Sequence, residues 1–223
     1  MTSGPRDRRA VALTFDSNLT DSMIRELDTG KVGSFDNTAV IDELDQYQVP
    51  ATIFLAGKWM ERYPATVGRL AGDPLFELAS HSYSDLGFTD HCYSLGRIPE
   101  GRMAADVQHS EDLLRSFTPR ATKFFRFPGG CYDDAALRAI APTGVVVVQY
   151  DVASGDAFGT DVAAIVREVL DKARNGSIVV LHITGGNTAP LTAQALPAII
   201  TGLRDKGFSL ETLTHLLGVT GTP

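Results

Sequence analysis

The sequence predicts an α/β protein in which helices cover a parallel β-sheet. Short apolar runs rich in β-branched residues alternate along the chain with stretches whose apolar residues recur at helical spacing. The runs are apolar almost throughout, which is typical of strands buried on both faces of a parallel sheet. We count about six or seven strand–helix repeats, and these observations together predict a single-domain (β/α) barrel or a close variant of it.

An open, doubly wound sheet is the alternative fold. Neither a G-x-G-x-x-G sequence nor a P-loop follows any predicted strand, so nothing favours a nucleotide-binding sheet. No linker rich in Pro, Gly or Ser divides the chain. We therefore expect one domain over residues 10–223, preceded by a flexible N-terminal arm at residues 1–9.

The strands are predicted from apolar runs bounded by turn residues. Residues 10–15, AVALTF, form the first, and residues 144–152, GVVVVQYDV, form the most apolar one. A helical pattern follows most runs, as expected for parallel strands joined by crossovers. The remaining predicted strands are 49–57, 76–82, 123–130, 177–183 and a short one that begins at 208.

The helices are predicted from apolar stripes and from end signals. Residues 37–48 place their apolar side chains on one face. Residues 161–174 end before Asn175 and Gly176, a pair that favours helix termination. The remaining predicted helices are 59–74, 99–117, 133–142, 191–207 and a short one that ends at 218.

Charge and composition argue against several classes of protein. The net charge of −7 disfavours a protein that holds nucleic acid through phosphate contacts. No apolar run reaches about 18 residues, so we expect no membrane span. We also expect a monomeric protein. The start, MTSGPRDRRA, lacks the apolar segment of a signal peptide. The chain as it stands would be cytoplasmic, whereas removal of a leader would make it extracellular or part of the cell envelope.

Polar residues gather where predicted strands end. Because the carboxyl ends of parallel strands form one rim, these side chains are expected to converge there. A carboxylate can act as general base, an imidazole as general acid, and an arginine can orient the base, so the set suits hydrolysis. The residues are Asp16, His81, Arg126, Asp151 and His182.

His81 and Asp85 lie four residues apart in the stretch HSYSD. On a helical turn both side chains would lie on one face, where they could hold one metal ion. The alternative is that Asp85 only caps a helix or a turn.

On these residues the sequence resembles the polysaccharide deacetylases, the NodB-homology group of metal-dependent carbohydrate esterases. Five motifs appear in the family's order between Thr14 and His182. The resemblance implies a distorted (β/α) barrel with about seven parallel strands. It also implies removal of acetyl groups from an N-acetylated or O-acetylated polysaccharide, with partners such as peptidoglycan or chitin oligomers.

The resemblance implies a role for each motif residue. Asp16 in TFDS would be the general base, with Arg126 of RFPGG orienting it. His182, which follows Leu181, would be the general acid, and Asp151 would tune it. Three further residues would shape the substrate pocket: Gly129 through an oxyanion-binding N–H, Leu181 at the acetyl group, and Phe158 where the family has a Trp.

The metal ligands depart from the family's usual Asp-His-His set. Ser17 replaces the aspartate, neighbouring Asn18 offers an amide oxygen instead, and Asp85 replaces the second histidine. With His81 these side chains would hold a divalent ion, Zn²⁺ first and Co²⁺, Ni²⁺ or Mn²⁺ as alternatives. Two alternatives remain open: an impaired relative that binds glycan without hydrolysing it, and a hydrolase of another amide or ester.

The two cysteines follow the second and third motifs of the resemblance. Cys92 and Cys131 would therefore lie on two loops of the same rim. A disulfide between them would tie these loops together and indicate an oxidising compartment, whereas two free thiols are the alternative.

Overall fold

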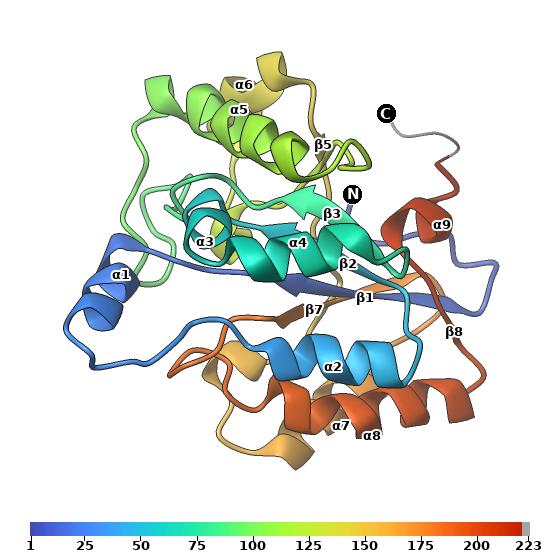
Figure 1. Ribbon diagram of the computed structural model, residues 1–223. Helices are drawn as coiled ribbons and strands as arrows, with labels where there is room; N and C mark the ends of the chain where they lie inside the picture. Colours follow the sequence, from blue (N-terminus) through green and yellow to red (C-terminus); the bar gives the residue numbers. More distant parts are fainter. Residues whose placement is uncertain (220–223) are drawn as a thin grey trace.

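A computed structural model describes residues 1–219, and its strands form a single sheet of parallel pairs (Figure 1). β8 (Ser209–Leu210) pairs with the start of β1 outside the main path. The predicted barrel-like arrangement of about seven parallel strands is confirmed. The main path runs β5 (Val146–Val147), β4 (Phe124–Phe125), β3 (Phe76–Ser80), β2 (Ala51–Leu55), β1 (Ala10–Asp16), β7 (Ser177–His182) and β6 (Val152–Ala153).

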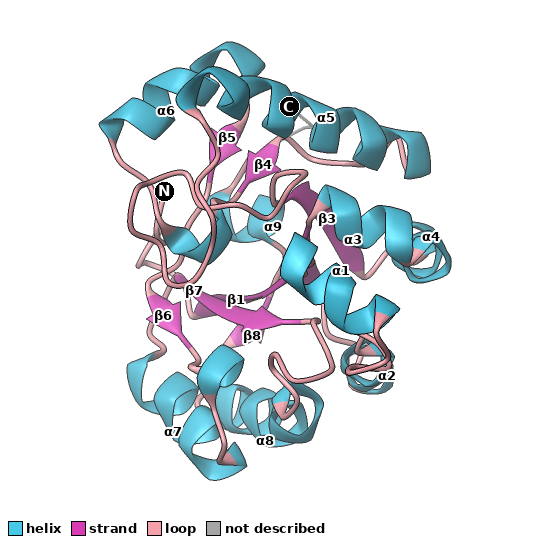
Figure 2. Ribbon diagram, turned by 90° about the vertical axis from the view of Figure 1, so that its left-hand side faces the viewer, coloured by secondary structure: helices cyan, strands magenta, loops and turns pink. Residues whose placement is uncertain are grey.

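Most of the helices lie around the outside of the curled sheet, whereas α9 lies near its centre in the view of Figure 2 and packs Leu213 and Leu216 into a second buried cluster. Phe15 of β1 and Leu181 of β7 belong to one large buried cluster that also contains Ile41 of α2 and Ile199 of α8. Burial of the apolar surface of these strands and helices makes the main favourable contribution to the free energy of folding. The helices are α1 (Asp21–Asp28), α2 (Thr38–Gln46), α3 (Gly57–Arg62), α4 (Pro64–Gly72), α5 (Glu100–Phe117), α6 (Asp134–Ile140), α7 (Val162–Lys172), α8 (Thr192–Asp205) and α9 (Leu213–Leu217).

The sheet is open between its two end strands, β5 and β6, and the first residues of the chain bridge this opening. The Met1 amine donates to the Val147 carbonyl of β5 over 2.8 Å. Ser3 forms an antiparallel bridge with Ser177 at the start of β7, and the Gly4 N–H donates to Gly176. The segment expected to be a flexible arm is thus attached to both sides of the opening, because its backbone groups find partners there.

Several elements differ from the sequence-based expectation. The helix predicted at 59–74 is two helices, because Pro64 has no N–H to continue the first and is suited to start the second. The strand predicted at 144–152 is reduced to β5 and β6, since the chain crosses the opening between them. Helix α1 was not predicted; the Thr20 hydroxyl caps it by accepting from Met23. Within residues 1–219, no helix combines the length and apolar character needed to cross a membrane.

Candidate active site

Asp16 and Arg126 form a buried pair at the carboxyl end of the sheet. Arg126 donates from Nη1 to Asp16 Oδ1 over 2.7 Å and to Thr14 Oγ1 over 2.9 Å. Its guanidinium lies 4.0 Å from the centroid of the Phe54 ring, so the cation is also stabilised by an aromatic face. The pair holds the Asp16 carboxylate in a fixed orientation, as a general base requires.

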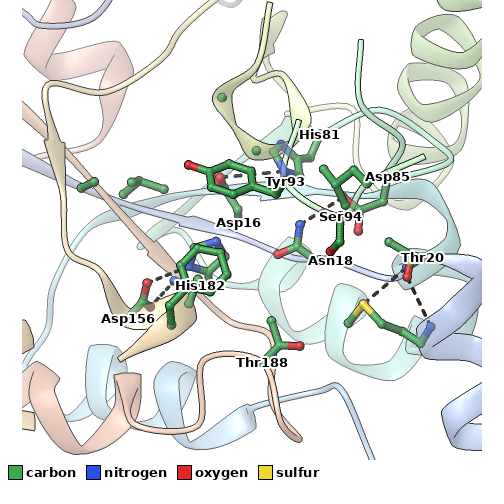
Figure 3. A pocket seen from close by; sticks show the side chains of 18 of the residues that line it. Asp16, Asn18, Thr20, His81, Asp85, Tyr93, Ser94, Asp156, His182 and Thr188 are labelled. Atoms are coloured by element: carbon green, nitrogen blue, oxygen red, sulfur yellow. Dashed lines mark hydrogen bonds and ion pairs between the residues drawn. The ribbon is translucent and has the colours of Figure 1, made fainter. Parts of the chain in front are cut away.

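His182 ends β7 at the position paired with Asp16 on β1. Its Nδ1–H donates to Asp156 Oδ1 over 2.8 Å, and its backbone N–H donates to Oδ2 over 2.8 Å (Figure 3). Burial lowers the pKa of His182, but the Asp156 carboxylate outweighs this and raises the pKa above its ordinary value. Burial raises the pKa of Asp156, but the charge and hydrogen bond of His182 outweigh this and lower it, with smaller contributions from the Thr192 and Ser154 hydroxyls that also donate to Asp156.

Asp151, the residue predicted to tune His182, lies at the opposite end of β7. Its carboxylate accepts from the Ile178 N–H over 2.9 Å and pairs with Arg6 over 2.7 Å. Ile178 and His182 are four residues apart on one strand, so their backbones are separated by roughly 13 Å. Asp151 precedes β6, whereas Asp156 follows it, and only the second aspartate reaches the rim where His182 lies.

His81 follows β3 and faces Asp16. Its Nδ1–H donates to the Arg126 carbonyl over 3.0 Å, and its Nε2 lies 3.8 Å from Asp16 Oδ2. Burial lowers the pKa of His81 to about 4, against the opposing effect of Asp16. A neutral imidazole with Nδ1 hydrogen-bonded to a carbonyl leaves the Nε2 lone pair free to bind a cation.

Asp85 is completely buried beside Asn18. Asn18 donates from Nδ2 to Asp85 Oδ1 over 3.0 Å (Figure 3). Asn18 Oδ1 accepts from the Thr184 hydroxyl. Asp85 Oδ2 is buried and has no hydrogen-bond partner. Burial raises the pKa of Asp85 to about 7, although the Asn18 hydrogen bond acts in the other direction.

Two predicted site residues point away from the cleft. Leu181 belongs to the buried core, and Val180, one residue earlier, lines the cleft with His182. Successive strand side chains alternate between faces, so Val180 and His182 share a face that Leu181 cannot. The Ser17 hydroxyl is buried and accepts from the Ala56 N–H over 3.0 Å, so Ser17 is not directed at the other predicted metal ligands.

The cleft at this rim has a volume of about 540 Å³ and brings together Asp16, Asn18, His81, Asp85 and His182. Gly129 and Phe158, both predicted from the sequence, also line it. Gly129 adopts a φ of 62°, a conformation that glycine tolerates best. The predicted disulfide is confirmed: Cys92 and Cys131 are joined, with Cα atoms 5.8 Å apart.

The sequence-based prediction missed Asp156, Tyr93 and Tyr150 among the residues at the cleft. Asp156 was detectable, because it lies in the same motif stretch as Asp151 and precedes an aromatic residue by two positions. Tyr150 lies in the same stretch, directly before Asp151, whereas Tyr93 carries no such signal, since a lone tyrosine in a loop is common in any protein.

Comparison with known sequences identifies the family. A sequence model described as polysaccharide deacetylase matches residues 3–148. The chain belongs to the polysaccharide deacetylase family. A peptidoglycan-N-acetylglucosamine deacetylase of Bacillus cereus is 29% identical over 214 residues, which cover 96% of this chain and 70% of that protein. A chitooligosaccharide deacetylase of Bradyrhizobium is 27% identical, with 93% and 90% covered. The predicted class, a hydrolase of amide bonds, agrees with both names.

Solved structures agree with the family's fold. The crystal structure of a peptidoglycan N-acetylglucosamine deacetylase bound to a hydroxamate-type benzamide superposes with a TM-score of 0.82 at 26% identity, covering 100% of this chain and 94% of that one. A pseudoenzyme of the same family from Bacillus anthracis has a TM-score of 0.76 at 19% identity, covering 97% and 68%. The second likeness concerns the fold alone.

The donor atoms of the residues predicted as metal ligands suit a divalent cation in part. Asp85 Oδ2 is buried without a partner, and His81 Nε2 is free to donate its lone pair, so these two atoms have the required chemistry. Asn18 fits only after its amide turns, because it presents Nδ2 to Asp85 and an amide N–H cannot bind a cation. Within residues 1–219, no group of three or more His, Cys, Asp or Glu side chains is arranged to hold a metal.

Proposed function

We propose that this protein removes acetyl groups from an N-acetylated polysaccharide, such as peptidoglycan or chitin oligomers, at the cell envelope. The observation that carries the proposal is the facing pair Asp16 and His182, which occupy matched positions on β1 and β7 at one cleft. Each has its own buried partner, Arg126 for Asp16 and Asp156 for His182. Separately held acid and base side chains across one cleft suit amide hydrolysis.

In this proposal Asp16 takes a proton from the attacking water, and the hydrogen bond from Arg126 holds the Asp16 carboxylate in place. His182 carries a proton on Nε2 to the leaving amine, because Asp156 holds Nδ1–H and favours the imidazolium. The Gly129 N–H binds the developing oxyanion. A divalent ion held by His81 and Asp85, with the Asn18 amide oxygen as third donor, would polarise the acetyl carbonyl when bound.

Acetate release from N-acetylglucosamine oligomers, with and without Zn²⁺ or Co²⁺, tests the proposal. We expect release that is lost on treatment with a chelator and restored by added metal. Asp16→Asn and His182→Gln should each abolish it, while Asp134→Asn, at the start of α6, serves as the control. A panel that adds acetylated xylan and small amides separates this substrate from another amide or ester. Absence of acetate from every substrate with every metal would refute the proposal.

The second candidate is a protein that binds glycan without hydrolysing it. The Asn18–Asp85 hydrogen bond favours this alternative, since it occupies the position where a deacetylase needs a metal oxygen donor. It predicts measurable affinity for N-acetylglucosamine oligomers and no acetate. The double change Asn18→Asp and Asp85→His would then restore metal binding, measured by calorimetry with Zn²⁺. Asn18 is the better position for this change than Ser17, whose side chain faces Ala56.

A further inference from the structure

Two strongly exposed aromatic side chains meet at the cleft. Tyr93 is 72% exposed and Phe158 is 76% exposed, and both line the cleft. Their ring centroids are 5.6 Å apart, although the two residues lie far apart in the sequence. Single exposed apolar side chains are ordinary, but two that converge from different loops on one cleft indicate a binding surface.

The loop that carries Tyr93 is held in an unusual conformation. Tyr93 has a φ of 51°, a left-handed value that a bulky side chain adopts only under local constraint. The adjacent residue, Cys92, is joined to Cys131. A Cβ on Gly129 would lie 2.7 Å from Cys92 Sγ and 3.2 Å from Tyr93 Cδ2, so the loop packs directly on the Gly129 turn. The disulfide therefore sets where the Tyr93 ring lies relative to the cleft.

The surroundings of the aromatic pair identify the kind of ligand. The cleft is acidic, with Asp16, Asp85 and Glu26 among its lining residues, which disfavours phosphate-bearing ligands such as nucleic acid. Hydroxyl and amide side chains also line it, namely Asn18, Thr20, Ser22, Ser94, Asn187 and Thr188. A ligand with an apolar flat face and many hydroxyls on its edge matches both features, and a pyranose ring has this form.

We propose that Tyr93 and Phe158 form a sugar-stacking subsite, and that the Cys92–Cys131 disulfide positions Tyr93 for it. The inference rests on the proposed function for its polysaccharide ligand. The subsite binds a sugar of the chain beside the acetyl group that reacts, since Tyr93 lies at the same cleft as Asp16 and His81 (Figure 3). Tyr93 and Phe158 are binding residues, and the two cysteines are positioning residues.

The test is equilibrium binding of the N-acetylglucosamine tetramer, measured by calorimetry on the full chain without reference to turnover. Tyr93→Ala and Phe158→Ala are each expected to weaken binding by roughly five- to tenfold. Tyr93→Phe should bind as the wild type, because it keeps the ring. Tyr132→Ala is the matched control: Tyr132 is 42% exposed and follows Cys131, but it stacks on Phe127 instead.

The role of the disulfide is tested with the double variant Cys92→Ser, Cys131→Ser. It should weaken tetramer binding as much as Tyr93→Ala, and combining the two should add no further loss, because both act through one ring. Circular dichroism checks that the variants are folded. Reducing the disulfide of the wild type should weaken tetramer binding in the same way, and reoxidation should restore it. Additive losses would overturn the positioning role.

Two outcomes separate this inference from the proposed function. If the tetramer binds, Tyr93→Ala weakens it, and no acetate is released, the subsite stands and the deacetylase proposal fails. If acetate is released while Tyr93→Ala and Phe158→Ala bind the tetramer like the wild type, the deacetylase proposal stands and the subsite is refuted.

Discussion

Asp156 holds His182 by two hydrogen bonds of 2.8 Å, one to the ring Nδ1 and one to the backbone N–H. The first bond assigns the ring proton to Nδ1 and leaves Nε2 for proton exchange in the cleft. The second fixes the end of β7 relative to the loop after β6. Asp151 makes neither contact and instead contacts Ile178 and Arg6, so the two aspartates of the YDVASGD stretch have different partners.

Replacing Asp156 is therefore expected to impair turnover, and replacing Asp151 is not. Asp156→Asn should lower kcat for acetate release by about 100-fold, because the amide no longer stabilises the imidazolium of His182. Asp151→Asn should retain kcat and lower the free energy of unfolding, since it weakens the contacts with Arg6 and Ile178. Equal kcat values for the two variants would contradict the assignment.

The pH dependence of kcat should also differ between the wild type and Asp156→Asn. Asp156 raises the pKa of His182, and a general acid is active only while protonated. In the wild type, kcat should fall as the pH rises through this raised pKa. Asp156→Asn removes the cause, so the fall should move to lower pH. A profile that keeps its alkaline limb in Asp156→Asn would show that another group donates the proton.

Removing one partner of the buried Asp16–Arg126 pair should destabilise the protein strongly. Arg126→Met leaves the buried Asp16 carboxylate without its partner, which should cost roughly 3–5 kcal/mol of unfolding free energy. The double variant Asp16→Asn, Arg126→Met should be less destabilised than Arg126→Met, because no charge remains unpaired. Urea denaturation of the wild type, Asp16→Asn, Arg126→Met and the double variant measures this, and strict additivity of the two single effects would argue against the coupling.

Asp85 should make the metal-free protein less stable as the pH rises. Burial in the folded protein raises the pKa of Asp85 to about 7, from the ordinary aspartate value of 3.8 that applies in the unfolded chain. Between these values the folded state holds a proton that the unfolded state has released, so the free energy of unfolding falls with increasing pH. Asp85→Asn should lose this dependence. Urea denaturation of the wild type and Asp85→Asn at several pH values between these two pKa values, with chelator present, tests the prediction. If the unfolding free energy of both proteins changes equally with pH, Asp85 is not the cause.

The disulfide should contribute measurably to stability. Cys92 and Cys131 are 39 residues apart, and closing such a loop is worth about 4 kcal/mol from the entropy of the unfolded chain. Reduction should therefore lower the thermal unfolding midpoint. Thiol titration of the denatured protein checks the premise: no thiols are expected before reduction and two afterwards. Two reactive thiols in the unreduced protein would refute it.

The sequence pattern alone was enough to predict the fold class and three residues that lie together at the candidate site. Apolar strands alternating with helices require a parallel sheet, and such a sheet collects its strand ends at one rim. Asp16, Arg126 and His182 were found in this way because each comes directly after an apolar run. The Cys92–Cys131 pairing followed from the family's motifs, since both residues lie just beyond two of them.

Only the tertiary structure decided which of two neighbouring residues reaches the cleft. Asp156 rather than Asp151, Val180 rather than Leu181, and Asn18 rather than Ser17 reach the cleft. A shift of one strand residue reverses the face on which a side chain lies, and the bounds of short strands depend on their pairing. The contact between Tyr93 and Phe158 is likewise set by two loops that meet only in the folded chain. The sequence thus determined the rim and its chemistry, while the packing of strands and loops selected the side chains that line it.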